Sequence, residues 1–209
     1  DPTGSQTVRG CPLLLDFSTA SLAAGLADPS PLLFLLINSR ALEPEQVCQQ
    51  LTVLCRRLKP LLAQLERPWL VVSRGDSTLR GHTPLELEVI CSELGPFAAN
   101  LLVPAFPQGG RTTAAGVHLL QGEPLHHSAF ARDRRFGYPS SDLPHWLEHK
   151  TAGAIPATSV TRLKPADSFA QLEIGQWAVV DASSPNDLDV IAEQVLAELT
   201  RGRKHLCQS

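Results

Sequence analysis

Short apolar runs and stretches with helical periodicity alternate along most of the chain. Apolar runs bounded by polar or turn-forming residues predict strands, and they lie at 11–17, 31–39, 69–73, 100–106, 157–163 and 176–182. The run at 31–39 is almost continuously apolar, which is typical of a strand covered on both faces. Apolar residues at spacings of three and four predict helices, and they lie at 19–27, 44–66, 83–94, 141–150 and 185–201.

Local signals define some of these elements more sharply. Thr83 and Glu86 have the spacing of a capping box, with Pro84 at the first helical position and Gly95-Pro96 as the stop. Gln121-Gly122 predicts the turn of a hairpin within 116–125, and 126–145 is mostly irregular and polar. The final residues, 201–209, show no closing element.

Strands that alternate with helices favour a parallel sheet, because each crossover places its helix on a face of the sheet. We therefore predict an α/β fold with three layers: a mostly parallel sheet with helices on both faces, in a single domain over 1–209. The chain contains no methionine and opens at Asp1 in a loop-like segment. On this basis we expect it to be a piece of a longer protein.

Composition excludes several classes of function. The net charge of −3 gives no basic surplus for binding nucleic acid. No apolar run reaches the roughly 18 residues of a membrane span. The five cysteines include no CxxC pair and the histidines show no ligand spacing, so we expect reduced thiols, no metal site and a cytoplasmic location.

Polar side chains cluster where the predicted strands end. In an open α/β sheet, ligands bind beyond the carboxyl ends of the strands. The candidate binding residues at these ends are Asn38, Ser39, Arg40, Arg74, Asp76, Ser77, Arg80, Gly110 and Arg111. Asp181 follows the strand at 176–182 and is either another site carboxylate or a cap for the last helix.

Several arginines directed at one crevice indicate an anionic ligand, because a guanidinium donates two parallel hydrogen bonds to a carboxylate or phosphate. Hydroxyl and amide side chains suit a polyhydroxylated molecule, so a small sugar acid fits the set. Structural alternatives remain open. Arg74 or Arg80 could pair with Asp76 simply as an ion pair, and Gly109-Gly110 could be a turn that requires positive φ.

The chain resembles the N-terminal, substrate-binding domain of the four-carbon acid sugar kinases. The matching motifs are "DPTGSQTV" (1–8), "NSRAL" (38–42), "DSTLRGH" (76–82), "VPAFPQGGRTT" (103–113) and "FARDRRFGYPSSDL" (130–143). The resemblance implies a strand before Asp1 and a glycine-rich C-terminal domain that binds ATP and Mg²⁺. It also implies phosphoryl transfer to a hydroxyl of a threonate-, erythronate- or 3-oxo-tetronate-like substrate.

The resemblance also implies roles for individual residues. Asp76 would accept the proton of the hydroxyl that is phosphorylated, with Asp1 as the second candidate. Arg80 and Arg111 would bind the substrate carboxylate or the transferred phosphoryl group. The hydroxyls of the substrate would be hydrogen-bonded by Asn38, Arg40 and Ser77. The chain departs from the family pattern at Gly75, at Ala129 and at Arg9-Gly10.

Two other functions are compatible with the sequence. The first is a non-catalytic module, regulatory or ligand-binding, that keeps the acid pocket without a nucleotide domain. The second is a phosphohydrolase with Asp1 as nucleophile, but that chemistry needs a second aspartate two residues later, where Thr3 stands.

Overall fold

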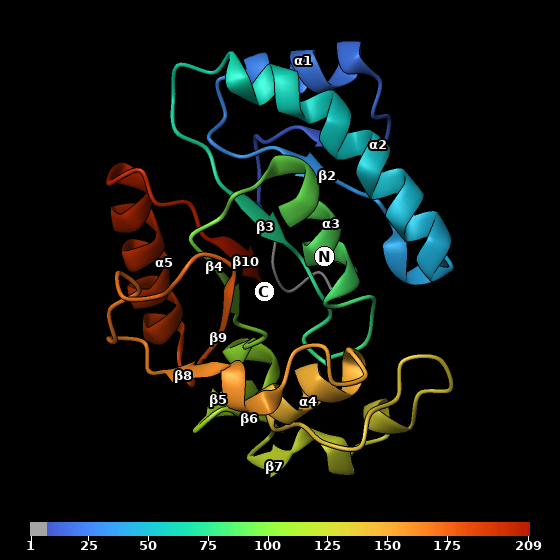
Figure 1. Ribbon diagram of the computed structural model, residues 1–209, viewed down its shortest axis with the longest axis vertical. Helices are drawn as coiled ribbons and strands as arrows, with labels where there is room; N and C mark the ends of the chain where they lie inside the picture. The colour runs from blue at the N-terminus through green and yellow to red at the C-terminus, as the bar shows by residue number, and fades with distance from the viewer. Residues whose placement is uncertain (1–7) are drawn as a thin grey trace.

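The computed structural model describes residues 8–209 (Figure 1). Its centre is a sheet of five parallel strands in the order β3-β10-β4-β9-β8. These strands are β3 (Val71–Ser73), β10 (Leu206–Gln208), β4 (Ala99–Leu102), β9 (Gln176–Val180) and β8 (Thr161–Leu163).

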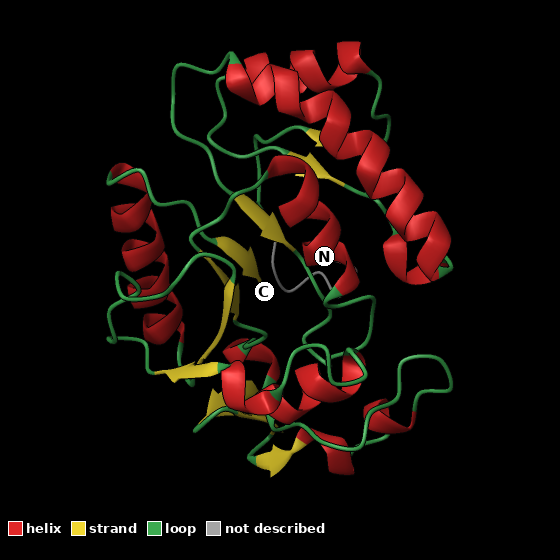
Figure 2. Cartoon of the chain, in the orientation of Figure 1, coloured by secondary structure: helices red, strands yellow, loops and turns green. Residues whose placement is uncertain are grey.

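The sheet is covered on both faces, because successive side chains of a strand point to opposite sides. Leu101 of β4 packs into a core with α5 (Pro185–Thr200), whereas Leu102 packs into a second core with α2 (Pro44–Ala63) and α3 (Leu85–Leu94). Figures 1 and 2 show α5 on one side of the strands and α2 with α3 on the other. The predicted three-layer α/β fold is confirmed.

The helices begin at recognisable caps. Helix α5 has a capping box between Ser184 and Asp187, and α2 has one between Glu43 and Gln46. The two shorter helices, α1 (Thr19–Ala27) and α4 (Leu143–Lys150), are capped by Ser18 and Asp142. The helical periodicity thus located these elements to within a few residues.

The run at 31–39 does not form a strand covered on both faces, and that prediction was wrong. Only β2 (Phe34–Leu35) is extended, and it pairs with β1 (Leu13–Leu14) in a separate two-stranded parallel sheet. Leu32 and Leu36 remain 47% and 53% exposed. Among residues 8–209 no strand pairs with the other edge of β2.

A small antiparallel sheet follows β4. It consists of β5 (Arg111–Ala114), β6 (Val117–Leu120) and β7 (Glu123–Pro124). The predicted turn at Gln121-Gly122 is confirmed, with both residues at positive φ, but β5 was not predicted. The remaining short elements are the 3₁₀ helices η1 (Ser39–Ala41), η2 (Pro107–Gly109), η3 (Leu125–His127), η4 (Phe130–Arg132) and η5 (Ala157–Ser159).

Two further predictions at the ends of elements were wrong. The chain does close with an element, because β10 inserts between β3 and β4 in the middle of the sheet. The capping box at Thr83 does not form: Pro84 occupies the N-cap position of α3, and the hydroxyl of Thr83 accepts a hydrogen bond from the Gln208 amide instead.

The five cysteines are free thiols, as predicted from their spacing. Burial raises the pKa of Cys91 to about 11 and that of Cys55 to about 12. Within residues 8–209, no helix combines the length and apolar character that crossing a membrane requires.

Candidate functional site

The loop between β3 and α3 carries the densest group of charged side chains. Asp76 lies in this loop just beyond the carboxyl end of β3, with its side chain 13% exposed. Its Oδ1 accepts hydrogen bonds from the backbone N–H of Thr78 at 2.9 Å and from the Thr78 hydroxyl at 2.7 Å. Its Oδ2 is ion-paired with Arg40 and with Arg80, and Nη2 of Arg80 lies at 2.9 Å.

Arg40 reaches this loop from a different part of the fold. It lies in η1, after β2, 36 residues before Asp76 in the sequence, and its side chain is 52% exposed. Arg80 is less exposed, and its guanidinium also lies 3.7 Å from Asp133 and 5.0 Å from the ring centre of Phe130. The ion pair with Asp76 that the sequence left open is thus formed by Arg80.

These contacts lower the pKa of Asp76. Burial acts to raise it, but the hydrogen bonds from Thr78 and the positive charges of Arg80 and Arg40 outweigh that effect. Since a carboxylate offers about four lone-pair positions, the partners present occupy most of its capacity. In this arrangement Asp76 is a fixed anion that organises two arginines.

The loop also holds a strained residue. Leu79 has a φ of 62°, in the left-handed region that branched side chains rarely adopt. Its N–H donates to the Asp76 carbonyl at 2.8 Å, and its side chain is 4% exposed within the core. Strain of this kind persists where the surroundings over-determine the backbone, as they often do at functional sites.

Arg111 joins the same loop through Ser77. Its Nε donates to the Ser77 hydroxyl at 2.9 Å, and its guanidinium lies 4.9 Å from the ring centre of Phe106. The carbonyl of Ser77 is held in turn by Nε2 of His118 at 2.9 Å. Arg80 and Arg111 therefore contact neighbouring positions of one loop, although they come from separate elements.

The two glycines before Arg111 shape its approach. Gly110 has a φ of 71°, so the predicted turn at positive φ is present there. A Cβ on Gly109 would lie 2.5 Å from the Phe106 ring and 2.9 Å from Nη2 of Arg111. Glycine at 109 thus allows the guanidinium to pack closely against its own loop.

The segment 130–138 contacts both the loop and the residues around η1. The hydroxyl of Tyr138 donates to the Thr78 carbonyl at 2.8 Å. Arg135 donates to the carbonyls of Arg40 and Leu42 and pairs with Glu43 at 3.0 Å. We did not predict these supporting roles, although the segment is one of the motifs that carry the resemblance.

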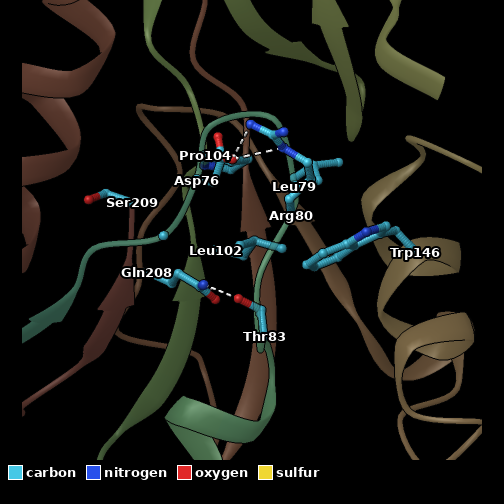
Figure 3. Close-up of a pocket in the computed structure, with 10 residues that line it drawn as sticks. Asp76, Leu79, Arg80, Thr83, Leu102, Pro104, Trp146, Gln208 and Ser209 are labelled. Carbon is cyan, nitrogen blue, oxygen red and sulfur yellow. Dashed lines mark hydrogen bonds and ion pairs between the residues drawn. The ribbon is translucent and has the colours of Figure 1, made fainter. Parts of the chain in front are cut away.

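A small cavity adjoins the Asp76 side chain (Figure 3). Asp76, Arg80, Thr83, Trp146 and Gln208 are among the residues that line it, and its volume is about 10 Å³. It lies beyond the carboxyl ends of β3, β10 and β4, where the fold predicts ligand binding. Gln208 was missed because no strand was predicted at the end of the chain.

A second, more open cavity of about 310 Å³ lies between the starts of α2 and α3. Its lining includes Pro44, Thr83, Arg135 and Lys150. Nζ of Lys150 donates to the Gly81 carbonyl at 3.2 Å, and burial lowers the pKa of this amine. The cavity borders the loop at its C-terminal end, at Gly81 and Thr83.

The other predicted site residues have different positions. Asn38 is exposed in a left-handed conformation directly before η1, and Ser39 begins that turn. Asp181 accepts hydrogen bonds from the backbone N–H groups of Ala115 and Gly116, so it fixes the β5–β6 turn and does not cap α5. Asp1 lies outside the described residues.

The described residues also bear on metal and nucleotide binding. Within 8–209, no group of three or more His, Cys, Asp or Glu side chains has an arrangement that could hold a metal ion. A glycine-rich phosphate loop with the pattern GxxxxGK[ST] is also absent from the sequence.

Comparison with known proteins identifies a family and several relatives. A family model described as a sugar-binding N-terminal domain matches residues 1–209. The D-erythronate kinase of Heliobacterium modesticaldum is 32% identical over 162 residues, which cover 74% of this chain and 36% of that enzyme. The chain thus spans little more than a third of this relative.

Solved structures share the fold at lower identity. A DUF1537 protein from Bordetella bronchiseptica, crystallised with citrate as a domain-swapped dimer, has a TM-score of 0.70 at 22% identity, over 95% of this chain and 48% of that one. Haemophilus influenzae protein HI1011, also DUF1537, has a TM-score of 0.63 at 18% identity, over 85% and 43%. With the family match over its full length, this chain belongs to the sugar-binding N-terminal domains of the four-carbon acid sugar kinase family.

Proposed function

We propose that this chain binds a four-carbon sugar acid, of the erythronate or threonate type, and presents one of its hydroxyls for phosphorylation. The observation that carries the proposal is the meeting of three arginines at one loop. Arg40 and Arg80 pair with Asp76, and Arg111 binds the adjacent Ser77. Guanidinium groups from distant segments of the chain can together bind a carboxylate, and these three contact a loop at the carboxyl ends of the strands.

The relatives agree with this chemistry. The curated relative is named a D-erythronate kinase, and the Bordetella structure contains citrate, which is also a small carboxylic acid. Asn38, Ser39 and the exposed Arg74 lie at strand ends, where they would complete the recognition of hydroxyls and carboxylate. Gly110 would allow the ligand to approach the backbone.

Asp76 needs to release a partner before it can accept a proton. Its Oδ2 holds both Arg40 and Arg80, and its lowered pKa makes it a weak base in this state. Arg40 is the more exposed of the two arginines and makes one ion pair here. We propose that the ligand carboxylate takes over Arg40, which frees Oδ2 to accept the hydrogen bond of the reacting hydroxyl. Asp1 remains the second candidate for that role.

The nucleotide would be supplied from elsewhere in the protein. ATP with Mg²⁺ provides the phosphoryl group in a kinase of this type. We propose that a C-terminal domain binds both, since the described residues offer no metal cluster of their own. The positive charges of Arg80 and Arg111 would then stabilise the charge on the transferred group.

We further propose that a strand preceding Asp1 lies between β2 and β3. Within residues 8–209, β3 pairs only with β10 and β2 only with β1, so one edge of each strand has no partner. Leu35 and Val71 nevertheless pack against the same core. An added parallel strand would join the two sheets and cover Leu36 and Val72, which are 53% and 44% exposed. Slower hydrogen exchange at Val71–Ser73 in a version extended upstream would support this, and unchanged exchange would refute it.

A non-catalytic module is the alternative function, and the full pairing of Asp76 favours it. The two functions differ in what the longer native protein does. Transfer of phosphate from ATP to D-erythronate by that protein, lost in Asp76→Asn, supports the kinase. Binding of the acid without any phosphate transfer supports the module.

Ligand binding by this chain can be measured directly by thermal unfolding. D-erythronate and L-threonate at millimolar concentration should raise the melting temperature, because a ligand that binds only the folded state stabilises it. Erythritol, which lacks the carboxylate, and succinate, which lacks the hydroxyls, are the matched controls. Equal effects of all four compounds, or no effect of the acids, would contradict the proposal.

A further inference from the structure

The side-chain amide of Gln208 is buried but only partly hydrogen-bonded. Gln208 is 4% exposed at the carboxyl end of β10. Its Nε2 donates to the hydroxyl of Thr83, whereas its Oε1 has no partner among the described residues. Because a hydroxyl both donates and accepts, turning the amide over would satisfy Oε1 and leave Nε2 without a partner. One atom of this amide therefore lacks a hydrogen bond in either orientation.

This amide lines the small cavity beside Asp76 (Figure 3). Three neighbouring strands end around the cavity, at Ser73, Leu102 and Gln208. The volume of about 10 Å³ is close to the minimum that one water molecule or one hydroxyl group requires. Buried polar groups are rarely left unpaired in folded proteins, so an occupant that completes the hydrogen bonding of Gln208 is expected there.

Gly75 makes room for the amide. A Cβ at position 75 would lie 2.8 Å from Nε2 of Gln208, closer than side chains approach one another. The φ of Gly75 is outside the left-handed region, so its backbone conformation does not require glycine. Glycine at this position, where the chain departs from the family pattern, thus leaves space for the Gln208 amide.

We propose that Gly75 and Gln208 form a subsite for one hydroxyl group of the bound acid. The Gln208 amide hydrogen-bonds this hydroxyl next to the Asp76 carboxylate and thereby selects acids that carry a hydroxyl at that carbon. The inference rests on the proposed function and adds to it the residue pair that recognises one hydroxyl of the substrate. A permanently bound water is the competing occupant.

The test measures affinities by isothermal titration calorimetry with the 209-residue chain. Gln208→Leu removes the amide, and Gln194→Leu, on α5, is the matched control because its amide N–H donates to the Pro165 carbonyl and does not line the cavity. The ligands are D-erythronate and its three monodeoxy analogues, each of which lacks one hydroxyl. We expect Gln208→Leu to weaken D-erythronate binding about tenfold and Gln194→Leu to leave it unchanged.

The analogues locate the effect. One of them should bind the wild-type chain about tenfold more weakly than D-erythronate does. That analogue should bind Gln208→Leu as well as it binds the wild-type chain, since the hydroxyl and its partner are then both absent. If Gln208→Leu does not fold, Gly75→Ala is the second variant, because the added methyl displaces the amide and should give the same loss. A wild-type chain that binds none of the acids contradicts the proposed function and removes the subsite with it. If the wild-type chain and Gln208→Leu bind D-erythronate equally well, the subsite alone is overturned and the cavity is assigned to a bound water.

Discussion

His118 should make the stability of this protein depend on pH between about 4 and 6.5. The ring is fully buried and joins the hairpin to the site: Nε2 lies 2.9 Å from the Ser77 carbonyl and Nδ1 lies 2.9 Å from the Thr113 hydroxyl. Since a carbonyl can only accept, Nε2 carries the proton and Nδ1 accepts from the hydroxyl. Protonation of Nδ1 would disturb this arrangement and the loop that Arg111 binds.

The size of the effect follows from the pKa. Burial, together with the positive charge of Arg111, lowers the pKa of His118 from 6.5 to about 4, against the opposing hydrogen bond from the ring to Ser77. The unfolded chain therefore binds a proton below pH 6.5 that the folded chain refuses until pH approaches 4, so stability falls as the pH is lowered through this window. At 1.36 kcal/mol per pKa unit, the loss is about 2 kcal/mol at pH 5 and about 3 kcal/mol at pH 4.

Urea denaturation at several pH values measures this contribution. His118→Gln keeps an N–H donor for Ser77 but does not titrate, so its stability should fall less than that of the wild type by the amounts above. His149→Gln, at an exposed histidine, is the control and should follow the wild type. Equal losses of unfolding free energy in the wild type and in His118→Gln between pH 7 and pH 4 would rule out this role of His118.

Three further substitutions test the loop that carries the charged cluster. Asp76→Asn removes the anion that holds two arginines and should lower the free energy of unfolding by about 2 kcal/mol at pH 7, unlike the exposed Asp189→Asn. Because its pKa is lowered in the folded state, Asp76 stabilises the protein at pH values above its unfolded pKa. The difference in unfolding free energy between the wild type and Asp76→Asn should therefore vanish as the pH falls through the folded pKa. A difference unchanged at acidic pH would contradict the pairing. Gly109→Ala places a methyl 2.9 Å from the Arg111 guanidinium and should weaken binding of D-erythronate in calorimetry, and unchanged affinity would exclude a role for that turn. Tyr138→Phe loses one buried hydrogen bond to the loop and should lower the unfolding free energy by about 1 kcal/mol, with no loss indicating that the segment does not support the site.

The sequence predicted four of the five strands of the central sheet but not β10, the strand at the end of the chain. Alternation of apolar runs and helical periodicity predicted β3, β4, β8 and β9 because each is bounded by turn-forming residues. β10 has only three residues and follows a polar stretch, so no local pattern distinguishes it. Its central place depends on pairing with β3 and β4, which are distant in the sequence.

The apolar run at 31–39 shows the opposite difficulty. Its hydrophobicity predicted a strand buried on both faces, yet only two residues are extended and Leu36 is exposed. Burial depends on what packs against a segment, and the described residues contain no strand beside its open edge. The apolar pattern indicates that the segment is suited to a buried environment, and the proposed upstream strand would provide that burial.

The candidate site was predictable where residues lie at strand ends. Asp76, Arg80 and Arg40 were named from their positions, and they lie in contact. The cap at Thr83 failed because a tertiary partner, Gln208, took the hydroxyl that a local helix cap would have used. Such long-range competition leaves no local signature in the sequence.

We propose that the arginine cluster around Asp76 binds the carboxylate of a small sugar acid. A crystal structure of the chain with D-erythronate measures this directly. We expect the carboxylate within hydrogen-bonding distance of Arg40, Arg80 or Arg111, with a hydroxyl beside Asp76. An acid bound elsewhere, such as in the cavity that Lys150 lines, with the pairs of Asp76 undisturbed, would contradict it.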